Sequence, residues 1–126
     1  MTVTSLGPVQ PENAPGQALY LLRYTIVPGT RLPLHHHEGT QIGLVVSGEL
    51  TYRVERGEVP VFRTEAAGET VLVRTIRAGE TVRIFAGEWV VEEPEDRHWG
   101  ANEGTEPLEI VTSALLRDGA PLASRD

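Results

Sequence analysis

The sequence of 126 residues contains no cysteine. Disulfide bonds and thiolate metal sites are therefore excluded, so any bound metal must be held by nitrogen and oxygen atoms. The sequence also lacks an apolar run near the roughly 20 residues that a membrane-spanning helix needs. Residues 1–17 have neither a basic start nor a hydrophobic centre, so they do not resemble a secretory signal. We therefore expect a cytoplasmic protein with no membrane partner.

Basic side chains are few and scattered along the chain. The 11 basic residues are all arginines, and 18 acidic residues outweigh them to give a formal net charge of −7. A nucleic-acid surface needs a stripe of positive charge, so nucleic acid is not an expected partner. The excess of acidic charge is most simply explained by solubility. The length of the chain suits a single domain.

Long stretches with helical periodicity are missing as well. Short runs rich in β-branched and aromatic residues recur about every 8–12 residues and end at glycine or proline, as in all-β sandwiches and barrels. The 13 glycines supply tight turns for such a fold. The sequence therefore predicts an all-β fold. The expected strands cover residues 20–27, 42–46, 50–54, 59–63, 70–77, 81–85, 89–91 and 108–112.

The two ends of the chain differ from this middle part. Residues 1–17 contain Pro8, Pro11 and Pro15, which predicts an irregular N-terminal arm that is either disordered or laid across a partner subunit. Residues 114–126 are expected to form an irregular C-terminal tail on the exterior. The barrel domain between them spans residues 18–113, and no second domain is needed.

Only four histidines occur, and three of them are consecutive. Side chains alternate between the two faces of a strand, so His35 and His37 share one face and His36 points to the other. Two imidazoles on one face can reach a single divalent metal ion. Considered alone, the run is more simply explained as a solvated patch than as a metal site. His98 lies far along the chain, and a closed barrel can bring it opposite the pair.

The spacing of these residues resembles the first motif of the cupin superfamily, G-x5-H-x-H-x(3,4)-E-x6-G. Gly29, His35, His37, Gln41 and Gly48 reproduce that spacing, and glutamine stands in place of the motif's glutamate. A neutral amide removes one negative charge from the site and offers one carbonyl oxygen. Gln41 is therefore expected either to coordinate the metal weakly or to hydrogen-bond a water bound to it.

The second cupin motif, G-x5-P-x-G-x2-H-x3-N, is matched less completely. Gly87, His98 and Asn102 stand at the required intervals. Pro94 falls one place late, and counted from Pro94, Asp96 stands where the motif has glycine. The turn before His98 is therefore expected to differ in shape. The resemblance covers roughly residues 18–113 and is closest to small single-domain cupins of type 2.

The resemblance implies a jelly-roll barrel, also called a double-stranded β-helix, with one divalent transition metal in its mouth. The metal would be Fe, Zn, Mn or Ni. The implied ligands are His35, His37, Gln41 and His98. Many small cupins are homodimers, so we expect a homodimer. The region between the motifs is long and is expected to add a hairpin around residues 65–68.

For function, the resemblance implies a metal-dependent enzyme of the oxygenase or isomerase type that acts on a small organic substrate. The alternative is a non-catalytic module that binds a small ligand or senses metal, and a third possibility is a metal-free barrel. Tyr52 can donate a proton if it faces the cavity. The acidic residues 92, 93, 95 and 96 are expected to form a solvated turn, so no general base is assigned.

Overall fold

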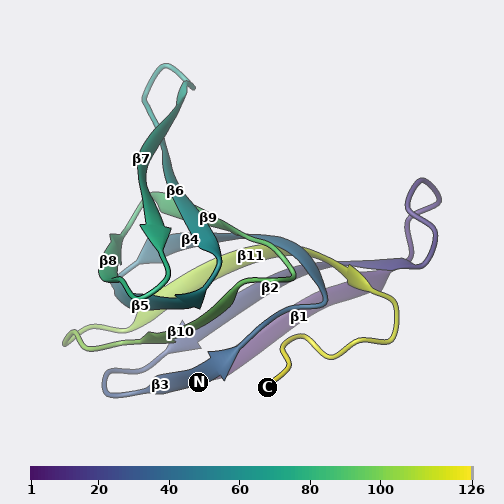
Figure 1. The fold of residues 1–126 in the computed structure, drawn as a ribbon, viewed down its shortest axis with the longest axis horizontal. Helices are drawn as coiled ribbons and strands as arrows, with labels where there is room; N and C mark the ends of the chain where they lie inside the picture. Colours follow the sequence, from purple (N-terminus) through teal and green to yellow (C-terminus); the bar gives the residue numbers. More distant parts are fainter. Residues whose placement is uncertain (126) are drawn as a thin grey trace.

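The computed structural model describes residues 1–125, and these form eleven strands in two antiparallel sheets and no helix. None of the described residues, therefore, belongs to a helix that could span a membrane. A seven-stranded sheet, in the order β1-β2-β11-β4-β9-β6-β7, faces a four-stranded sheet, in the order β3-β10-β5-β8 (Figure 1). The strands are β1 (Thr2–Val9), β2 (Gln17–Ile26), β3 (Arg31–His35), β4 (Gly39–Ser47), β5 (Glu49–Arg56), β6 (Glu58–Thr64), β7 (Thr70–Arg77), β8 (Thr81–Phe85), β9 (Glu88–Glu92), β10 (Arg97–Ala101) and β11 (Leu108–Arg117).

The core lies between the two sheets, because alternate residues of each strand point inward. Along β9, for example, residues 88, 90 and 92 are buried while the intervening residues are only half-buried. Removing such apolar side chains from water is the main favourable contribution to folding. The bounds of β7 and β8 are those predicted from the sequence. The largest cluster of buried apolar side chains includes Ile26, Val45, Val54, Val61, Ile84 and Leu108.

The all-β jelly-roll fold is confirmed, but the prediction of a closed barrel is wrong. Among residues 1–125, the hydrogen-bonded ladders form two separate sheets with free edges. Two sheets that bury their inner faces against one another already shield the core, so closure is not required. The sheets still bring residues from distant parts of the chain together between them.

The hairpin predicted between the motifs is present as β6 and β7, which project from the rest of the molecule (Figure 1). Its turn is held by backbone hydrogen bonds from Glu65 N to Glu69 O and from Gly68 N to Glu65 O. The glycine at position 68 has a φ of +87°, which residues with a Cβ rarely adopt.

The prediction of a wholly irregular N-terminal arm is wrong. Residues 2–9 form β1, which pairs with β2 at the edge of the larger sheet, and every residue of β1 is exposed. Proline is tolerated in an edge strand or at a bulge, and Pro8 lies where the register shifts between Leu6 and Val9. At the other end of the chain, β11 continues past residue 113 to Arg117, so the tail is not irregular from residue 114.

The homodimer expected from the cupin resemblance stays a prediction. The outer face of β1 and β2 exposes large apolar side chains, among them the cross-strand neighbours Leu6 and Leu21. Exposed apolar patches often mark protein–protein contacts. Sedimentation velocity of the full chain will test this prediction, because a homodimer gives twice the mass of one chain.

Gly39, the first residue of β4, is required by a close approach of two strands. A Cβ at this position would lie 2.0 Å from the carbonyl oxygen of Leu115 on β11. We expect Gly39→Ala to lower the free energy of unfolding by about 3 kcal/mol, the upper part of the range for overpacking. Urea unfolding followed by circular dichroism measures this loss.

Gly43, on the same strand, provides the matched control. A Cβ there would meet the Val90 side chain at 3.5 Å, which is an ordinary van der Waals contact. Gly43→Ala should therefore change the free energy of unfolding by less than about 1 kcal/mol. Equal losses in the two variants would contradict the assignment of a close strand approach at Gly39.

Candidate metal centre

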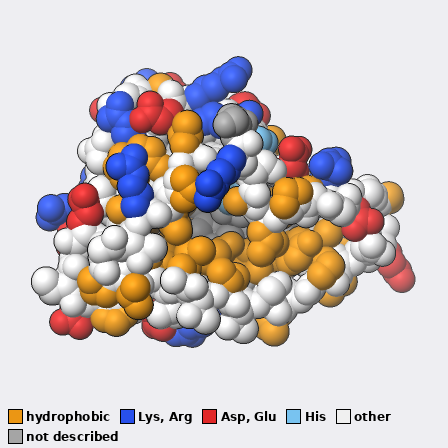
Figure 2. All heavy atoms as spheres, turned by 90° about the horizontal axis from the view of Figure 1, so that it is seen from below, with side chains coloured by type: hydrophobic (Ala, Val, Ile, Leu, Met, Phe, Trp, Pro, Cys, Tyr) orange, Lys and Arg blue, Asp and Glu red, His pale blue; other side chains and the backbone are white. Residues whose placement is uncertain are grey.

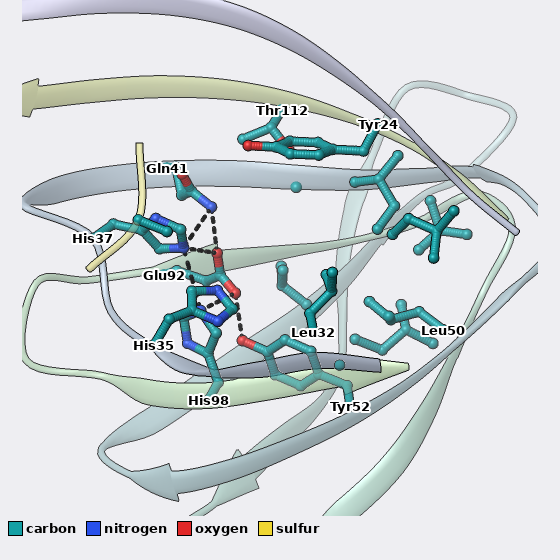
Figure 3. Close-up of a pocket in the computed structure, with 18 of the residues that line it drawn as sticks. Tyr24, Leu32, His35, His37, Gln41, Leu50, Tyr52, Glu92, His98 and Thr112 are labelled. Atoms are coloured by element: carbon teal, nitrogen blue, oxygen red, sulfur yellow. Dashed lines mark hydrogen bonds and ion pairs between the residues drawn. The ribbon is translucent and has the colours of Figure 1, made fainter. Parts of the chain in front are cut away.

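The four predicted site residues and Glu92, which was not predicted, come from both sheets and meet between them. His35 at the end of β3 and His98 on β10 are paired neighbours in the smaller sheet. Gln41 on β4 and Glu92 on β9 are paired neighbours in the larger sheet. His37 lies in the connection between β3 and β4 and points to the same place (Figure 3).

The predicted separation of the histidines is confirmed. His35 and His37 both line the cavity between the sheets, whereas His36 does not. The backbone of His36 forms a bridge with Ser124, and its ring lies 3.5 Å from the carboxylate of Glu38. β3 ends at His35, but His36 still pairs with Ser124, so the extended conformation and its alternation of side chains continue past the end of the strand.

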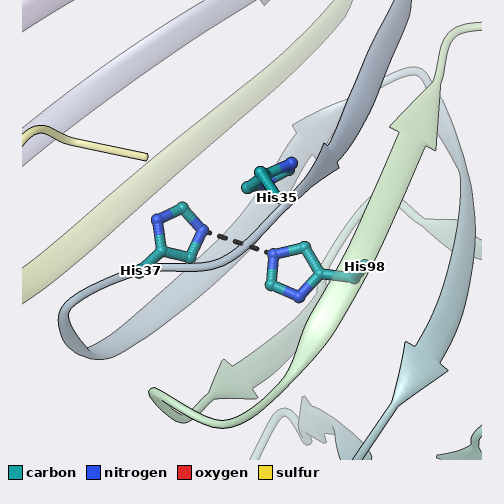
Figure 4. Close-up of side chains that lie close together, drawn as sticks. All are labelled: His35, His37 and His98. Carbon is teal, nitrogen blue, oxygen red and sulfur yellow. Dashed lines mark hydrogen bonds between the residues drawn. The ribbon is translucent and has the colours of Figure 1, made fainter. Parts of the chain in front are cut away.

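The three other histidines form one cluster. Ligand nitrogens of His35, His37 and His98 all lie within 4.8 Å of one another. The Nε2 atoms of His37 and His98 are 3.3 Å apart (Figure 4). The centroid of the His35 ring lies 4.9 Å from that of His37 and 4.5 Å from that of His98. A cluster of this size can hold a single ion.

The hydrogen bonds of the His35 and His37 rings show which ring nitrogen carries the proton, and therefore which one is free to bind a metal. His35 Nδ1 lies 2.7 Å from the carbonyl oxygen of Pro33, and His37 Nδ1 lies 2.7 Å from that of Leu122. A carbonyl oxygen only accepts, so each Nδ1 carries the proton. In a neutral ring the lone pair is then on Nε2, which is the arrangement seen in histidines that bind metals. The donor set therefore fits a divalent metal.

Burial favours the neutral form of the histidines. It lowers the pKa of His98 to about 4, against a smaller opposing effect of the nearby Glu92 carboxylate. Burial also lowers the pKa of His35, although its hydrogen bond to Pro33 acts in the opposite direction. Both imidazole rings are therefore neutral at neutral pH. A neutral ring has a nitrogen lone pair that can bind a metal.

Glu92 is a residue of the site that sequence analysis missed. The prediction of a solvated turn for residues 92, 93, 95 and 96 is wrong at Glu92 and at Asp96, because both are buried, and Glu92 faces the histidines. Its carboxylate oxygens lie 3.1 Å from His98 Nε2 and 3.5 Å from His37 Nε2. The signal was present in the sequence: one more residue of β9 after Val91 places Glu92 on the same inward face as Val90.

Two hydrogen bonds hold the Glu92 carboxylate in place. It accepts from Gln41 Nε2 at 2.6 Å and from the Tyr52 hydroxyl at 2.5 Å. Burial alone would raise the pKa of Glu92, but the positive charge that His98 and His37 carry when protonated, together with these two hydrogen bonds, lowers it to about 2. Glu92 is therefore an ionised carboxylate at neutral pH.

Gln41 lines the same cavity, and its amide nitrogen faces the cluster. That nitrogen is 3.1 Å from His37 Nε2 and donates to Glu92. Coordination by the Gln41 carbonyl oxygen requires the amide to turn over, which would break the hydrogen bond to Glu92. Direct coordination by Gln41 stays a prediction.

Tyr52 faces the cavity, which was the condition for a role in proton transfer. Its ring stacks on that of His98 with centroids 5.4 Å apart, and it is buried. Burial and the adjacent Glu92 carboxylate raise the pKa of the Tyr52 hydroxyl well above its usual value. Tyr52 therefore stays protonated and acts as a hydrogen-bond donor.

The cluster lies at one end of a cavity of about 340 Å³. This volume is at the lower end of the range for sites that bind small molecules. The face shown in Figure 2 is hollowed between hydrophobic side chains. The remaining polar groups include Tyr24 and Thr112, on the opposite side from Tyr52 (Figure 3). The apolar part of the lining includes Ile26, Leu32, Val45, Leu50, Ile84, Val90 and Ile110.

Two other motif residues have structural roles. Asp96 is buried and accepts a hydrogen bond from Glu93 N at 2.8 Å, which closes the turn before His98. Asn102 is also buried, and its Nδ2 donates to the carbonyl oxygens of Ile26 and Glu106, each at 2.8 Å. These bonds explain how the turn and the following loop are fixed, and neither side chain lines the metal cavity.

The C-terminal segment, defined here as residues 118–125, crosses the site. Ser124 pairs with the backbone of His36, and Ala123 and Arg125 line the cavity. Met1 lines the same cavity, so both ends of the described chain lie beside the site. The carbonyl oxygen of Leu122 fixes the proton of His37 on Nδ1. The C-terminal segment thereby fixes the orientation of the His37 ring.

We expect a chain that ends at Gly119 to bind divalent metal about 10–100-fold more weakly, as is typical when an outer partner of a ligand histidine is removed. Leu122→Ala is the matched control, because it retains the carbonyl oxygen and should change the affinity by less than about threefold. Isothermal titration with Zn²⁺ measures both. Unchanged affinity in the shortened chain would contradict a role for the segment.

Two facing antiparallel sheets with a histidine cluster in the cavity between them define the class of double-stranded β-helix proteins. The family model for the cupin domain matches residues 22–114 of the chain. The chain therefore belongs to the cupin family. No curated protein matches it.

Solved structures with low sequence identity share the fold. A conserved protein with a double-stranded β-helix domain from Klebsiella pneumoniae subsp. pneumoniae is 19% identical, with a TM-score of 0.58 over 98% of this chain and 84% of that chain. A cupin superfamily protein from Desulfitobacterium hafniense is 11% identical, with a TM-score of 0.54 over 91% and 78%. A cupin 2 domain-containing protein from Halorhodospira halophila is 15% identical, with a TM-score of 0.58 over 98% and 65%. These similarities support the fold, but a shared fold does not indicate which reaction a protein catalyses.

Proposed function

We propose that this cupin is a metal-dependent enzyme of the oxygenase or isomerase type that acts on a small organic substrate. The observation that carries the proposal is a buried, ionised carboxylate beside the histidine cluster in a largely apolar cavity. An entirely apolar lining would instead have favoured passive binding. Buried titratable groups with shifted pKa values gather at catalytic sites.

In this proposal His35, His37 and His98 hold one divalent ion, which would supply Lewis-acid or redox chemistry to the substrate. The backbone carbonyls of Pro33 and Leu122 keep two of the rings turned toward that ion. Support for this assignment comes from the cluster geometry and the fixed positions of the ring protons.

The cavity indicates what kind of substrate fits. Its apolar walls suit a hydrocarbon body, and its polar groups lie at the histidine end and along one wall. Tyr24 keeps its proton, because burial raises the pKa of its hydroxyl. It can therefore donate a hydrogen bond to an oxygen of the substrate. We propose a small molecule with an apolar body and one oxygen-bearing end.

Metal content and turnover test the proposal together. Untagged protein should contain one divalent transition metal per chain by elemental analysis. Protein freed of metal and reloaded separately with Fe²⁺, Mn²⁺, Ni²⁺ or Zn²⁺ should consume oxygen or isomerise at least one member of a panel of diketones, thiols and catechols. Tight binding without turnover on a broad panel would favour a non-catalytic binding module, and absence of metal binding would overturn the proposal.

A further inference from the structure

The pair formed by Gln41 and Glu92 is the starting point. The two residues lie directly opposite each other on β4 and β9, and both side chains point into the cavity. Directly opposite residues have Cβ atoms about 4.5–5.5 Å apart, so either position can deliver a carboxylate to nearly the same point. Gln41 stands where the first cupin motif has glutamate, and the carboxylate is found one strand away.

Three distances between candidate ligand atoms, none of which involves His35, are close to those around a single ion. Ligand atoms about 2.0–2.1 Å from a tetrahedral or octahedral ion stand about 2.9–3.4 Å from one another. The separations are 3.1 Å from Glu92 Oε2 to His98 Nε2, 3.5 Å from Glu92 Oε1 to His37 Nε2, and 3.3 Å between the two Nε2 atoms, so each ring faces a different oxygen of the carboxylate. All three lie within about 0.1 Å of that range.

The charge of Glu92 also lacks a cationic partner. Gln41 and Tyr52, which donate to its two oxygens, are both neutral. Within residues 1–125, the basic groups found within 4.0 Å of the Glu92 carboxylate are the imidazoles of His37 and His98, which pair as ions only when they are protonated, and no arginine is among them. Burying a carboxylate without a compensating positive charge is costly. A divalent ion between the carboxylate and the histidines supplies that charge.

We propose that Glu92 is the carboxylate ligand of the metal, moved from β4 to β9, and that Gln41 is a positioning residue that holds it. This inference rests on the proposed function, because it requires a metal at the histidine cluster. The resulting ligand set is His35, His37, Glu92 and His98. Gln41 keeps its amide nitrogen on the carboxylate and its oxygen away from the metal.

Exchanging the two residues tests the proposal. We compare the wild-type full chain with Glu92→Gln, with Gln41→Glu/Glu92→Gln, and with Glu93→Gln as the control. Glu93 is the next residue, is exposed, and undergoes the same change of charge. In Zn²⁺ titrations of chelator-treated protein, Glu92→Gln should weaken binding by more than about 100-fold, beyond the usual effect of outer partners. The double variant should recover to within about tenfold of wild type, and the control should change less than threefold.

The absorption spectrum of bound Co²⁺ separates ligands from positioning residues, because its visible bands depend on the donor atoms and their number. Glu92→Gln and the shorter Glu92→Asp should both change this spectrum. Gln41→Ala should weaken Co²⁺ binding about 10–100-fold and leave the spectrum unchanged. Circular dichroism melting identifies any variant that fails to fold, and Glu92→Asp then provides the decisive spectrum.

The outcomes distinguish the two proposals. If wild type binds no divalent metal, the proposed function fails and this inference fails with it. If His98→Ala abolishes binding while Glu92→Gln retains the wild-type Co²⁺ spectrum, the metal centre stands and Glu92 is not a ligand. A spectrum altered by Gln41→Ala alone would make Gln41 the ligand and would likewise overturn the inference.

Discussion

His98→Ala should weaken divalent metal binding by more than about 100-fold and lower the metal content of purified protein to background. His98 is buried on β10 beside His35 of β3, and it supplies one of the three ligand nitrogens of the cluster. Losing a direct ligand should exceed the 10–100-fold effect of losing an outer partner. Isothermal titration with Zn²⁺ and elemental analysis measure the two quantities.

His36→Ala is the matched control for this experiment. It removes the same type of side chain from the same histidine-rich segment, and His36 lies outside the cluster. Its metal affinity should remain within about threefold of wild type. If both variants bind metal equally well, the cluster does not hold the ion.

The metal-free protein should lose stability as the pH falls from about 6.5 to about 4. Burial lowers the pKa of His98 to about 4 in the folded state, whereas an unfolded histidine titrates near about 6.5. The unfolded chain therefore takes up a proton within this window while the folded chain does not, so the free energy of unfolding falls with falling pH. The difference corresponds to about 3 kcal/mol at most. The lowered pKa of His35 acts in the same direction.

Urea unfolding of chelator-treated protein at several pH values measures this effect. His98→Asn cannot titrate in the window, so its stability should depend less steeply on pH than that of wild type. Parallel curves for the two proteins would assign the acid sensitivity to other groups. A domain of this size is typically stable by about 5–15 kcal/mol, so the expected loss is a substantial part of the total.

Much of the fold and part of the site follow from patterns with a fixed period. The strands β7 and β8 end where the apolar runs end, because glycine-containing turns interrupt them. The two-residue period of a strand places His35 and His37 together and His36 apart. The cupin spacing adds His98, which no local pattern could have joined to the others.

The rest of the site depends on contacts that local patterns do not encode. Glu92 was assigned to a solvated turn because acidic residues cluster after Val91, yet the strand continues for one residue and turns its side chain inward. The support of His37 comes from a backbone carbonyl at Leu122, and any residue type offers a carbonyl. The strand β1 was missed because Pro8 within it and the two prolines that follow it indicate irregular structure, although an edge strand tolerates a proline.

The position of Met1 and Arg125 at the cavity has a consequence for how this protein is produced in the laboratory. A purification tag joined next to Met1, or shortly after Arg125, would start close to residues that line the cavity. A polyhistidine tag would carry competing imidazoles to that place and inflate the apparent metal stoichiometry. Tags should therefore be cleaved before metal analysis, or carried on the exposed β6–β7 turn around residues 65–68, which projects away from the rest of the molecule (Figure 1).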